Sequence, residues 1–252
     1  MGNKKPRRQS KSAAVYIPVA VLLVSLLVMS GISVFLRIVD IEVSGASLYT
    51  KEEIIVASGI ALGDNMLFIN AGNIQQRIYS AMPYIDEVSV EVSLPDIVRI
   101  SISEAAPMAW IKFSGGVVVV DSKCKILEII DFIPDGLIEI IGFSPANITV
   151  GNDLKASPGD DTRLSSVKDV LTAIELEGVY KDISSIDVAN IAYISFSYGG
   201  RFNVILGKPD NMQYKMSVLK EFIASREEES SNDETGTIDM SVRGQWRYTP
   251  DR

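Results

Sequence analysis

The feature that most constrains this chain is a run without any charged side chain, which extends from Ser12 to Leu36. A helix of about 25 residues, at about 1.5 Å per residue, is long enough to span a hydrocarbon core of about 30 Å. The run is longer than the apolar core of a cleavable signal, and neither a small-x-small exit nor a lipid-anchor cysteine follows it. We therefore expect an uncleaved transmembrane helix at 13–36.

The residues before this run indicate which way the helix is inserted. No acidic residue lies among them, and basic side chains near a spanning helix are typical of its cytoplasmic end. Residues 1–12 are therefore expected to form a cytoplasmic basic tail, and the chain from Arg37 onward is expected to be exported. The basic residues of the tail are Lys4, Lys5, Arg7, Arg8 and Lys11.

Composition excludes several classes of function for the exported part. The net charge of the chain is −8, which disfavours nucleic-acid binding because phosphate neutralisation needs clustered Lys and Arg. The single cysteine, Cys124, excludes an intrachain disulfide and a thiolate zinc cage. The absence of histidine excludes Ser-His-Asp and Cys-His nucleophiles and histidine metal sites. We expect no catalytic residue, no metal site and no cofactor, and we interpret the acidic clusters Asp160–Asp161 and 227–229 as solvated loops.

The first exported segment has the pattern of a small α+β unit. Thr50 and Glu53 form the sequence signature of a capping box, and Asn70 can cap a second helix that ends before Pro83. Alternating apolar residues predict strands on either side of these helices. In chain order we expect a strand at 38–44, helices at 51–57 and 70–82, and strands at 87–93 and 98–104.

The second exported segment alternates between strand and helix patterns. Two helices are amphipathic or apolar-rich, whereas residues 226–235 are polar and acidic and predict an exposed loop. We expect strands at 183–188, 193–197, 202–206 and 236–242, a possible extension at 246–249, and helices at 163–177 and 212–223.

Three stretches carry a resemblance to a known family: VDIEVSGA (39–46), GDNMLFIN (63–70) and LPDIVRISISEAAPMAW (94–110). With the order of elements, they resemble the FtsQ/DivIB family of bacterial cell-division proteins. Residues 117–121 and 125–127 are similar to the hairpin that opens the family's second domain, which implies strands there. The chain departs from that family at Ala105, where Arg or Lys is usual, and at Cys124 in the turn of this hairpin, where Gly is often found. We interpret Cys124 as a tolerated turn residue. The resemblance implies an α+β fold with a POTRA domain (βααββ) at 37–106 and a mixed-sheet β domain with two helices at 107–225. The acidic exposed loop at 226–235 and the C-terminal strand or strands at 236–252 complete the β domain.

The resemblance also implies a function and a location. It implies a non-enzymatic scaffold, anchored in the cytoplasmic membrane and enriched at the division septum, that links division proteins and supports septal cell-wall synthesis. The implied partners are other single-pass division proteins of the FtsB/DivIC and FtsL types, and the septal peptidoglycan synthase complex. Carried over by position, the partner-binding edge strand comprises Thr237, Ile238, Asp239, Met240, Ser241 and Val242. Within it, Ile238, Met240 and Val242 are expected to face the core.

Two alternatives remain open at the level of the sequence. A POTRA-type module that assists protein export or envelope assembly shares the fold, although such modules are usually repeated and this chain shows one copy. A membrane-anchored Ser/Lys peptidase has a similar layout, with Ser44 or Ser47 as nucleophile just outside the membrane, but neither serine has the expected flanking residues.

Overall fold

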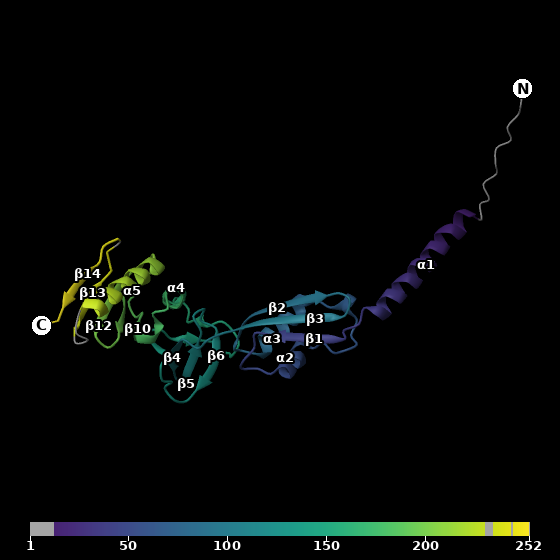
Figure 1. Ribbon diagram of the computed structural model, residues 1–252. Helices are drawn as coiled ribbons and strands as arrows, with labels where there is room; N and C mark the ends of the chain where they lie inside the picture. Colours follow the sequence, from purple (N-terminus) through teal and green to yellow (C-terminus); the bar gives the residue numbers. More distant parts are fainter. Residues whose placement is uncertain (1–12, 230–233, 243, 252) are drawn as a thin grey trace, which may run out of the picture. The chain divides into compact units, whose positions relative to one another are not determined.

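The computed structural model describes residues 13–229, 234–242 and 244–251, which divide into two compact units (Figure 1). The first unit contains the chain as far as Ile78 together with Glu87–Ser103. The second contains Tyr79–Asp86 and the chain from Glu104 onward. The expected basic tail, 1–12, lies outside the described residues.

The charge-free run forms one helix, α1 (Ala13–Phe35), of 23 residues with Pro18 inside it. Among the residues that the structure describes, no helix is both long enough and apolar enough to cross a bilayer.

The rest of the first unit is a three-stranded sheet with helices. The strands follow the order β1-β3-β2, and β1 runs parallel to β3 with Asp40 opposite Ile97. Figure 1 shows α2 and α3 on one side of β2 and β3. The elements are β1 (Asp40–Ser44), α2 (Lys51–Ser58), a short 3-10 helix (Met66–Phe68), α3 (Ala71–Ala81), β2 (Ile85–Ser93) and β3 (Ile97–Glu104).

Local side-chain caps determine where the two helices begin. The Thr50 hydroxyl accepts a hydrogen bond from the Glu53 N–H at 3.3 Å, and the Glu53 carboxylate accepts one from the Thr50 N–H at 2.8 Å. The Asn70 side chain accepts the N–H of Asn73 at 3.1 Å. Both predicted helix starts are therefore confirmed, because each cap satisfies an amide that has no partner within the helix.

The core of the first unit follows the alternation seen in the sequence, with one exception. Val98, Ile100 and Ile102 are buried on β3, as expected. Val39 alternates with Asp40 and Glu42 in the run at 38–44 and shares a parity with the buried Ile41, yet it is 66% exposed, whereas Ile38 is buried. The reason is that β1 begins only at Asp40, so the two-residue period does not extend back to Val39.

The second unit is dominated by a nine-stranded mixed sheet. Its strand order is β14-β13-β12-β11-β10-β7-β4-β5-β6, and a separate pair, β8 with β9, forms a small antiparallel sheet. The strands are β4 (Ala109–Phe113), β5 (Gly116–Val120), β6 (Ile126–Ile130), β7 (Ile138–Ile141), β8 (Pro145–Ala146), β9 (Lys155–Ala156), β10 (Ile183–Asp187), β11 (Ile194–Tyr198), β12 (Phe202–Gly207), β13 (Gly236–Asp239) and β14 (Arg247–Pro250). The helices are α4 (Asp161–Glu177), a short 3-10 helix (Tyr180–Asp182) and α5 (Met212–Glu229).

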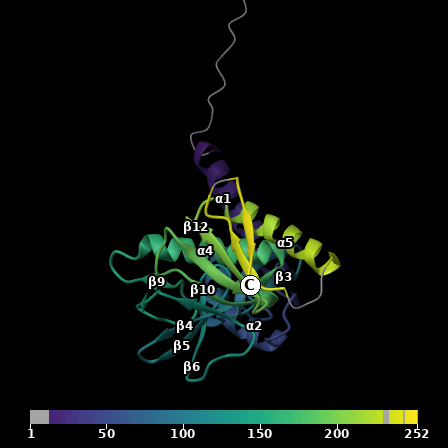
Figure 2. The same cartoon turned by 90° about the vertical axis from the view of Figure 1, so that its left-hand side faces the viewer.

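The two long helices lie on one face of this sheet, as Figure 2 shows for α4 and α5. Val167, Val170, Leu171 and Ile174 are fully buried on the face of α4 that the sequence predicted to be apolar. They join the core formed by alternate strand residues such as Ile186, Val204 and Ile238. An α+β fold with a second, mixed-sheet unit containing two long helices is thus confirmed.

Two expectations near the C-terminus need correction. First, α5 continues to Glu229, so residues 226–229 are helical and not part of an exposed loop. Arg and Glu are good helix formers, and the guanidinium of Arg226 lies 5.4 Å from the centre of the Phe222 ring one turn earlier. Second, the strand expected at 236–242 ends at Asp239, and the possible extension at 246–249 is a separate strand, β14.

Candidate partner-binding interface

The C-terminal edge of the nine-stranded sheet is formed by β14 and not by the strand that the sequence indicated. β13 lies between β12 and β14: it pairs in parallel with β12, Val204 opposite Ile238, and antiparallel with β14, Ile238 opposite Tyr248. An inner strand uses its backbone groups on both sides, so it cannot accept a further strand. The edge position expected for 236–242 is therefore corrected to β14.

The six residues expected to bind a partner have different environments. Ile238 and Met240 are buried, as expected, but Val242 is 58% exposed and does not face the core. Thr237, Asp239 and Ser241 are half-buried. The Ser241 N–H donates to the Asp239 carboxylate at 2.8 Å, so these two polar residues partner each other.

An aromatic cluster supports β14 against α5. The ring centroid of Phe222 lies 5.3 Å from the centroid of Trp246 and 5.3 Å from that of Tyr248. The centroids of Phe202 and Tyr248 are 6.1 Å apart. The Tyr248 hydroxyl lies 2.8 Å from a Glu234 carboxylate oxygen. Such tilted and edge-to-face pairs each add about 0.5–1.5 kcal/mol beyond burial, and they hold the edge strand in place.

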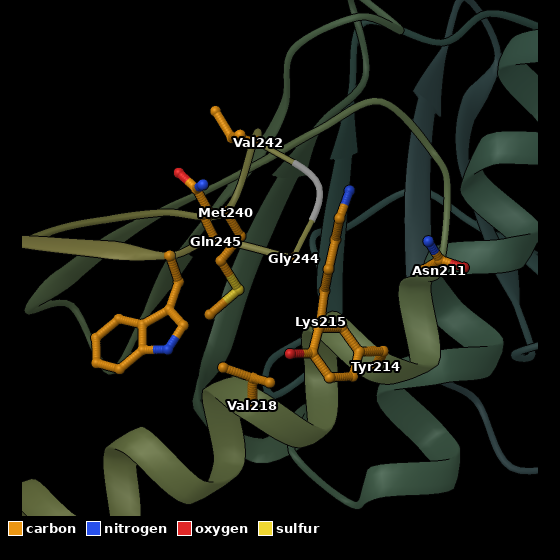
Figure 3. A pocket seen from close by; sticks show the side chains of 9 residues that line it. Asn211, Tyr214, Lys215, Val218, Met240, Val242, Gly244 and Gln245 are labelled. Carbon is orange, nitrogen blue, oxygen red and sulfur yellow. The ribbon is translucent and has the colours of Figure 1, made fainter.

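A small pocket lies beside this cluster, between α5 and the segment that joins β13 to β14 (Figure 3). Figure 3 shows the Met240 side chain pointing toward Val218, whereas Val242 points away from the helix. Tyr214 is 56% exposed and Trp246 50% exposed, so the pocket has aromatic side chains that reach solvent. Its lining residues are Asn211, Tyr214, Lys215, Val218, Met240, Val242, Gly244, Gln245 and Trp246.

Lys215 in this pocket has a structural role. Its ammonium donates to the Leu206 and Lys208 carbonyls at 2.8 and 2.9 Å and to the Asp210 carboxylate at 2.8 Å. These bonds fix the start of α5 to the end of β12. All three ammonium protons have acceptors, so Lys215 positions the pocket and does not offer it a free charge.

Two titratable groups at this edge have shifted pKa values. Burial, and then the neighbouring Glu234 carboxylate, raise the pKa of Tyr248. The hydrogen bonds from Ser241 lower the pKa of Asp239. At neutral pH Tyr248 is therefore a hydrogen-bond donor and Asp239 is ionised, so the edge carries a fixed acidic group beside apolar rings.

The other residues that the sequence singled out have ordinary surroundings. The Ser44 hydroxyl lies 3.4 Å from the Ser101 hydroxyl, which is not a general base. Cys124 is 3% exposed, and burial raises the pKa of its thiol to about 12, which leaves it in the unreactive thiol form. Its φ of +63° explains why glycine also suits this turn.

Sequence reasoning missed Tyr214, Trp246 and Tyr248 as contributors to this edge. One signal was available, because Gly244 separates two short stretches that pair as a hairpin. The possible extension expected at 246–249 overlaps β14, but its weak alternation around Tyr248 did not indicate that it forms the edge of the sheet.

Comparison with known families gives a direct match to the first unit. Residues 36–105 match the family described as POTRA domain, FtsQ-type. This range covers β1 to β3 and the helices between them.

Curated relatives extend the similarity over most of the chain. A protein named cell division protein FtsQ, from Corynebacterium glutamicum, is 31% identical over 160 residues, which cover 60% of this chain and 71% of that protein. Cell division protein DivIB from Clostridium acetobutylicum is 24% identical over 216 residues, which cover 85% of this chain and 83% of that protein. DivIB from Clostridium botulinum is 25% identical over 245 residues, covering 96% and 91% respectively.

Proposed function

The chain belongs to the FtsQ/DivIB family of cell-division proteins, and from this membership we propose that it is a non-enzymatic scaffold of the division machinery. In this proposal it links other single-pass division proteins and supports septal cell-wall synthesis. The observation that carries the proposal is the C-terminal edge, where exposed apolar side chains line a pocket beside the last strand of the sheet. An edge strand binds an extended partner segment through its backbone, and adjacent pockets select the partner's side chains.

The residues expected to bind the partner fall into two groups in this proposal. Val242, together with Tyr214 and Trp246, contacts the partner directly, since each is at least half exposed. Thr237, Ile238, Asp239, Met240 and Ser241 act mainly by holding β14 and the pocket in position. The partners are proteins of the FtsB/DivIC and FtsL types, and through them the septal peptidoglycan synthase complex.

The proposal includes the location and the division of the chain. Residues 13–36 anchor the protein in the cytoplasmic membrane with 1–12 in the cytoplasm, and the folded units act outside it, enriched at the septum. The functional boundaries are 37–106 for the POTRA domain, 107–225 for the β domain, and 236–252 for the strands that complete it. The charge-free composition of α1 and the basic residues before it support this placement.

Partner capture by purified protein tests the proposed edge. The full chain in detergent micelles is mixed with the exported parts of the FtsB/DivIC-type and FtsL-type proteins of the same bacterium. We expect Trp246→Ala combined with Val242→Ser to weaken binding at least tenfold, whereas Tyr193→Ala, at a tyrosine that is also about half exposed, leaves it unchanged. Equal binding by all three proteins would refute the assignment of this edge, and no binding by the unaltered chain would refute the scaffold itself.

A further inference from the structure

The opposite end of the nine-stranded sheet is formed by β6, which differs in character from β14. β6 is the outermost strand at this end of the sheet that the described residues form. Figure 2 shows β5 and β6 at one end of the second unit and the C-terminal strands at the other. Four of its five residues are apolar: Ile126, Leu127, Ile129 and Ile130. The chain then continues through Phe132 and Ile133, which are 62% and 63% exposed.

The part of the chain that the structure describes covers only the beginning of this edge. The Ile126 N–H donates to the Asn152 carbonyl at 2.9 Å, and the Gly151 N–H donates to the Ile126 carbonyl at 2.8 Å. Beyond Ile126 the strand extends four residues further along the edge. Any added strand would therefore pair from about Glu128 onward.

The exposed side chain of β6 continues the core face of the sheet. Ile129 lies opposite Val118, which is fully buried, and side chains opposite each other on paired strands share a face. Ile129 itself is 43% exposed, because β6 is the outermost strand that the described residues form at this end of the sheet. A further strand with an apolar residue opposite Ile129 would complete this layer.

The two ends of the sheet differ in how they are protected. β14 carries Arg247 and ends at Pro250, which lacks a backbone N–H, so an added strand can pair with it only before its last residue. β6 carries neither proline nor an exposed lysine or arginine. An edge strand of mostly apolar residues, followed by two exposed large apolar residues, is characteristic of an interaction surface.

Charge identifies the class of partner. Glu128, Asp131 and Asp135 alternate along the chain with the exposed apolar residues, and the described residues from 126 to 137 include no basic side chain. We propose that β6 binds an extended segment of another protein in which apolar residues alternate with Lys or Arg, so that a strand is added at this end of the sheet. This second docking edge is separate from the C-terminal edge and goes beyond the function proposed above.

Two other occupants fit the surface less well. A second copy paired through β6 would bring the same three carboxylates of both chains together, and like charges across strands are destabilising. An anionic lipid surface would be repelled by the same acidic residues. A strand in which apolar residues alternate with Lys or Arg can hydrogen-bond to the β6 backbone, cover its apolar side chains and pair with the carboxylates.

Synthetic peptides test this inference without knowledge of the natural partner. The probes are a blocked eight-residue peptide of alternating Val and Lys, the same peptide with Glu in place of Lys, and the Val/Lys peptide with alternate backbone nitrogens methylated. Binding to the full chain in detergent micelles is followed by hydrogen–deuterium exchange. We expect the Val/Lys peptide to bind saturably and to slow exchange at least tenfold within 128–133, and the other two peptides to bind at least tenfold more weakly.

Variants assign the effect to this edge. Phe132→Ser combined with Ile133→Ser should weaken binding of the Val/Lys peptide at least tenfold, whereas Leu176→Ser, at a similarly exposed leucine on α4, should not change it. The inference is overturned by equal binding of the Val/Glu or the methylated peptide, or by protection that maps only to β14. It is also overturned if the Val/Lys peptide does not bind and Phe132 and Ile133 instead support self-association, measured by sedimentation. The same holds if, without peptide binding, they support retention on phosphatidylglycerol vesicles.

Discussion

At the scale of single residues, the most unusual environment in the second unit belongs to Lys125. Its side chain is 2% exposed, its ammonium donates to the Ile85 carbonyl at 2.6 Å, and it lies 3.5 Å from the centre of the Tyr79 ring. Burial lowers the pKa of Lys125, although the nearby carboxylates of Asp121 and Asp86 oppose this shift. The lysine thus connects segment Tyr79–Asp86 to the turn that precedes β6.

We predict that Lys125→Met destabilises the protein by about 1–3 kcal/mol, because a buried carbonyl loses its donor and the cation–π contact disappears. Urea unfolding of the second unit measures the change. Lys123→Met is the matched control: its exposed ion pair with Asp86 should be worth at most about 1 kcal/mol. Equal losses for the two variants would show that the burial of Lys125 is unimportant.

Asp121, in the same turn, should make stability depend on pH. Burial raises the pKa of its carboxyl above the ordinary value of 3.8, despite hydrogen bonds from the Lys125 and Lys123 N–H groups. The folded state therefore holds this proton more tightly than the unfolded state, and stability falls as pH rises from 3.8 through the folded pKa.

We predict that Asp121→Asn removes this fall, since the amide oxygen can still accept both N–H groups. Urea midpoints of both proteins are measured between about pH 3.5 and pH 7. As pH rises, the midpoint of the unaltered chain should fall relative to that of the variant. Parallel curves for the two proteins would contradict the assignment.

At the scale of elements, a close approach of two backbones fixes the position of β13. A Cβ added to Gly207, whose φ is +70°, would lie 2.7 Å from the Ser241 Cα. Gly200 has a similar φ of +66°, but a Cβ there would meet nothing within 4 Å. An alanine at Gly200 would therefore introduce backbone strain alone, whereas an alanine at Gly207 would introduce the same strain and a steric clash.

We predict that Gly200→Ala costs about 1 kcal/mol from strain alone, whereas Gly207→Ala also displaces the chain after β13 and weakens partner binding. Urea unfolding and the capture of the FtsB/DivIC-type partner are measured on both variants. If Gly207→Ala bound the partner as well as Gly200→Ala does, the position of Ser241 would not matter for the interface.

The elements that could be predicted from the sequence are those with local signals. The capping side chains of Thr50 and Asn70 act within one turn, so both helix starts were predictable. β4 was missed although a short turn at 114–115 joins it to β5. β7 was not predictable, because it pairs in parallel with β4 and β10 and no local turn joins these strands. The edge was missed for a similar reason: whether β13 or β14 is outermost depends on pairing, to which the alternation of β13 alone gives no clue.

At the scale of the whole molecule, we propose that a membrane anchor acts together with docking edges on the folded part of the chain. If 13–36 lies in the membrane, partners with similar anchors meet the folded units at high local concentration, which strengthens weak contacts without new ones. The sequence predicts the anchor from charge and composition, whereas both docking edges are proposals.

We predict that deletion of residues 1–36 leaves partner binding in solution within about twofold but abolishes function in cells, because the gain in effective concentration is lost. Replacement of 13–36 by an unrelated transmembrane segment should restore function. Full function of the truncated chain would contradict the role of the anchor, and failure of the replacement would show that the segment makes specific contacts.

The central claim is that the chain serves division by docking partners at its C-terminal edge. Cell length tests it most directly, in a strain depleted of the native protein that expresses a variant at the same level. We predict that Trp246→Ala combined with Val242→Ser yields filaments, whereas Tyr193→Ala yields cells of normal length. Normal length with the double variant would contradict the account.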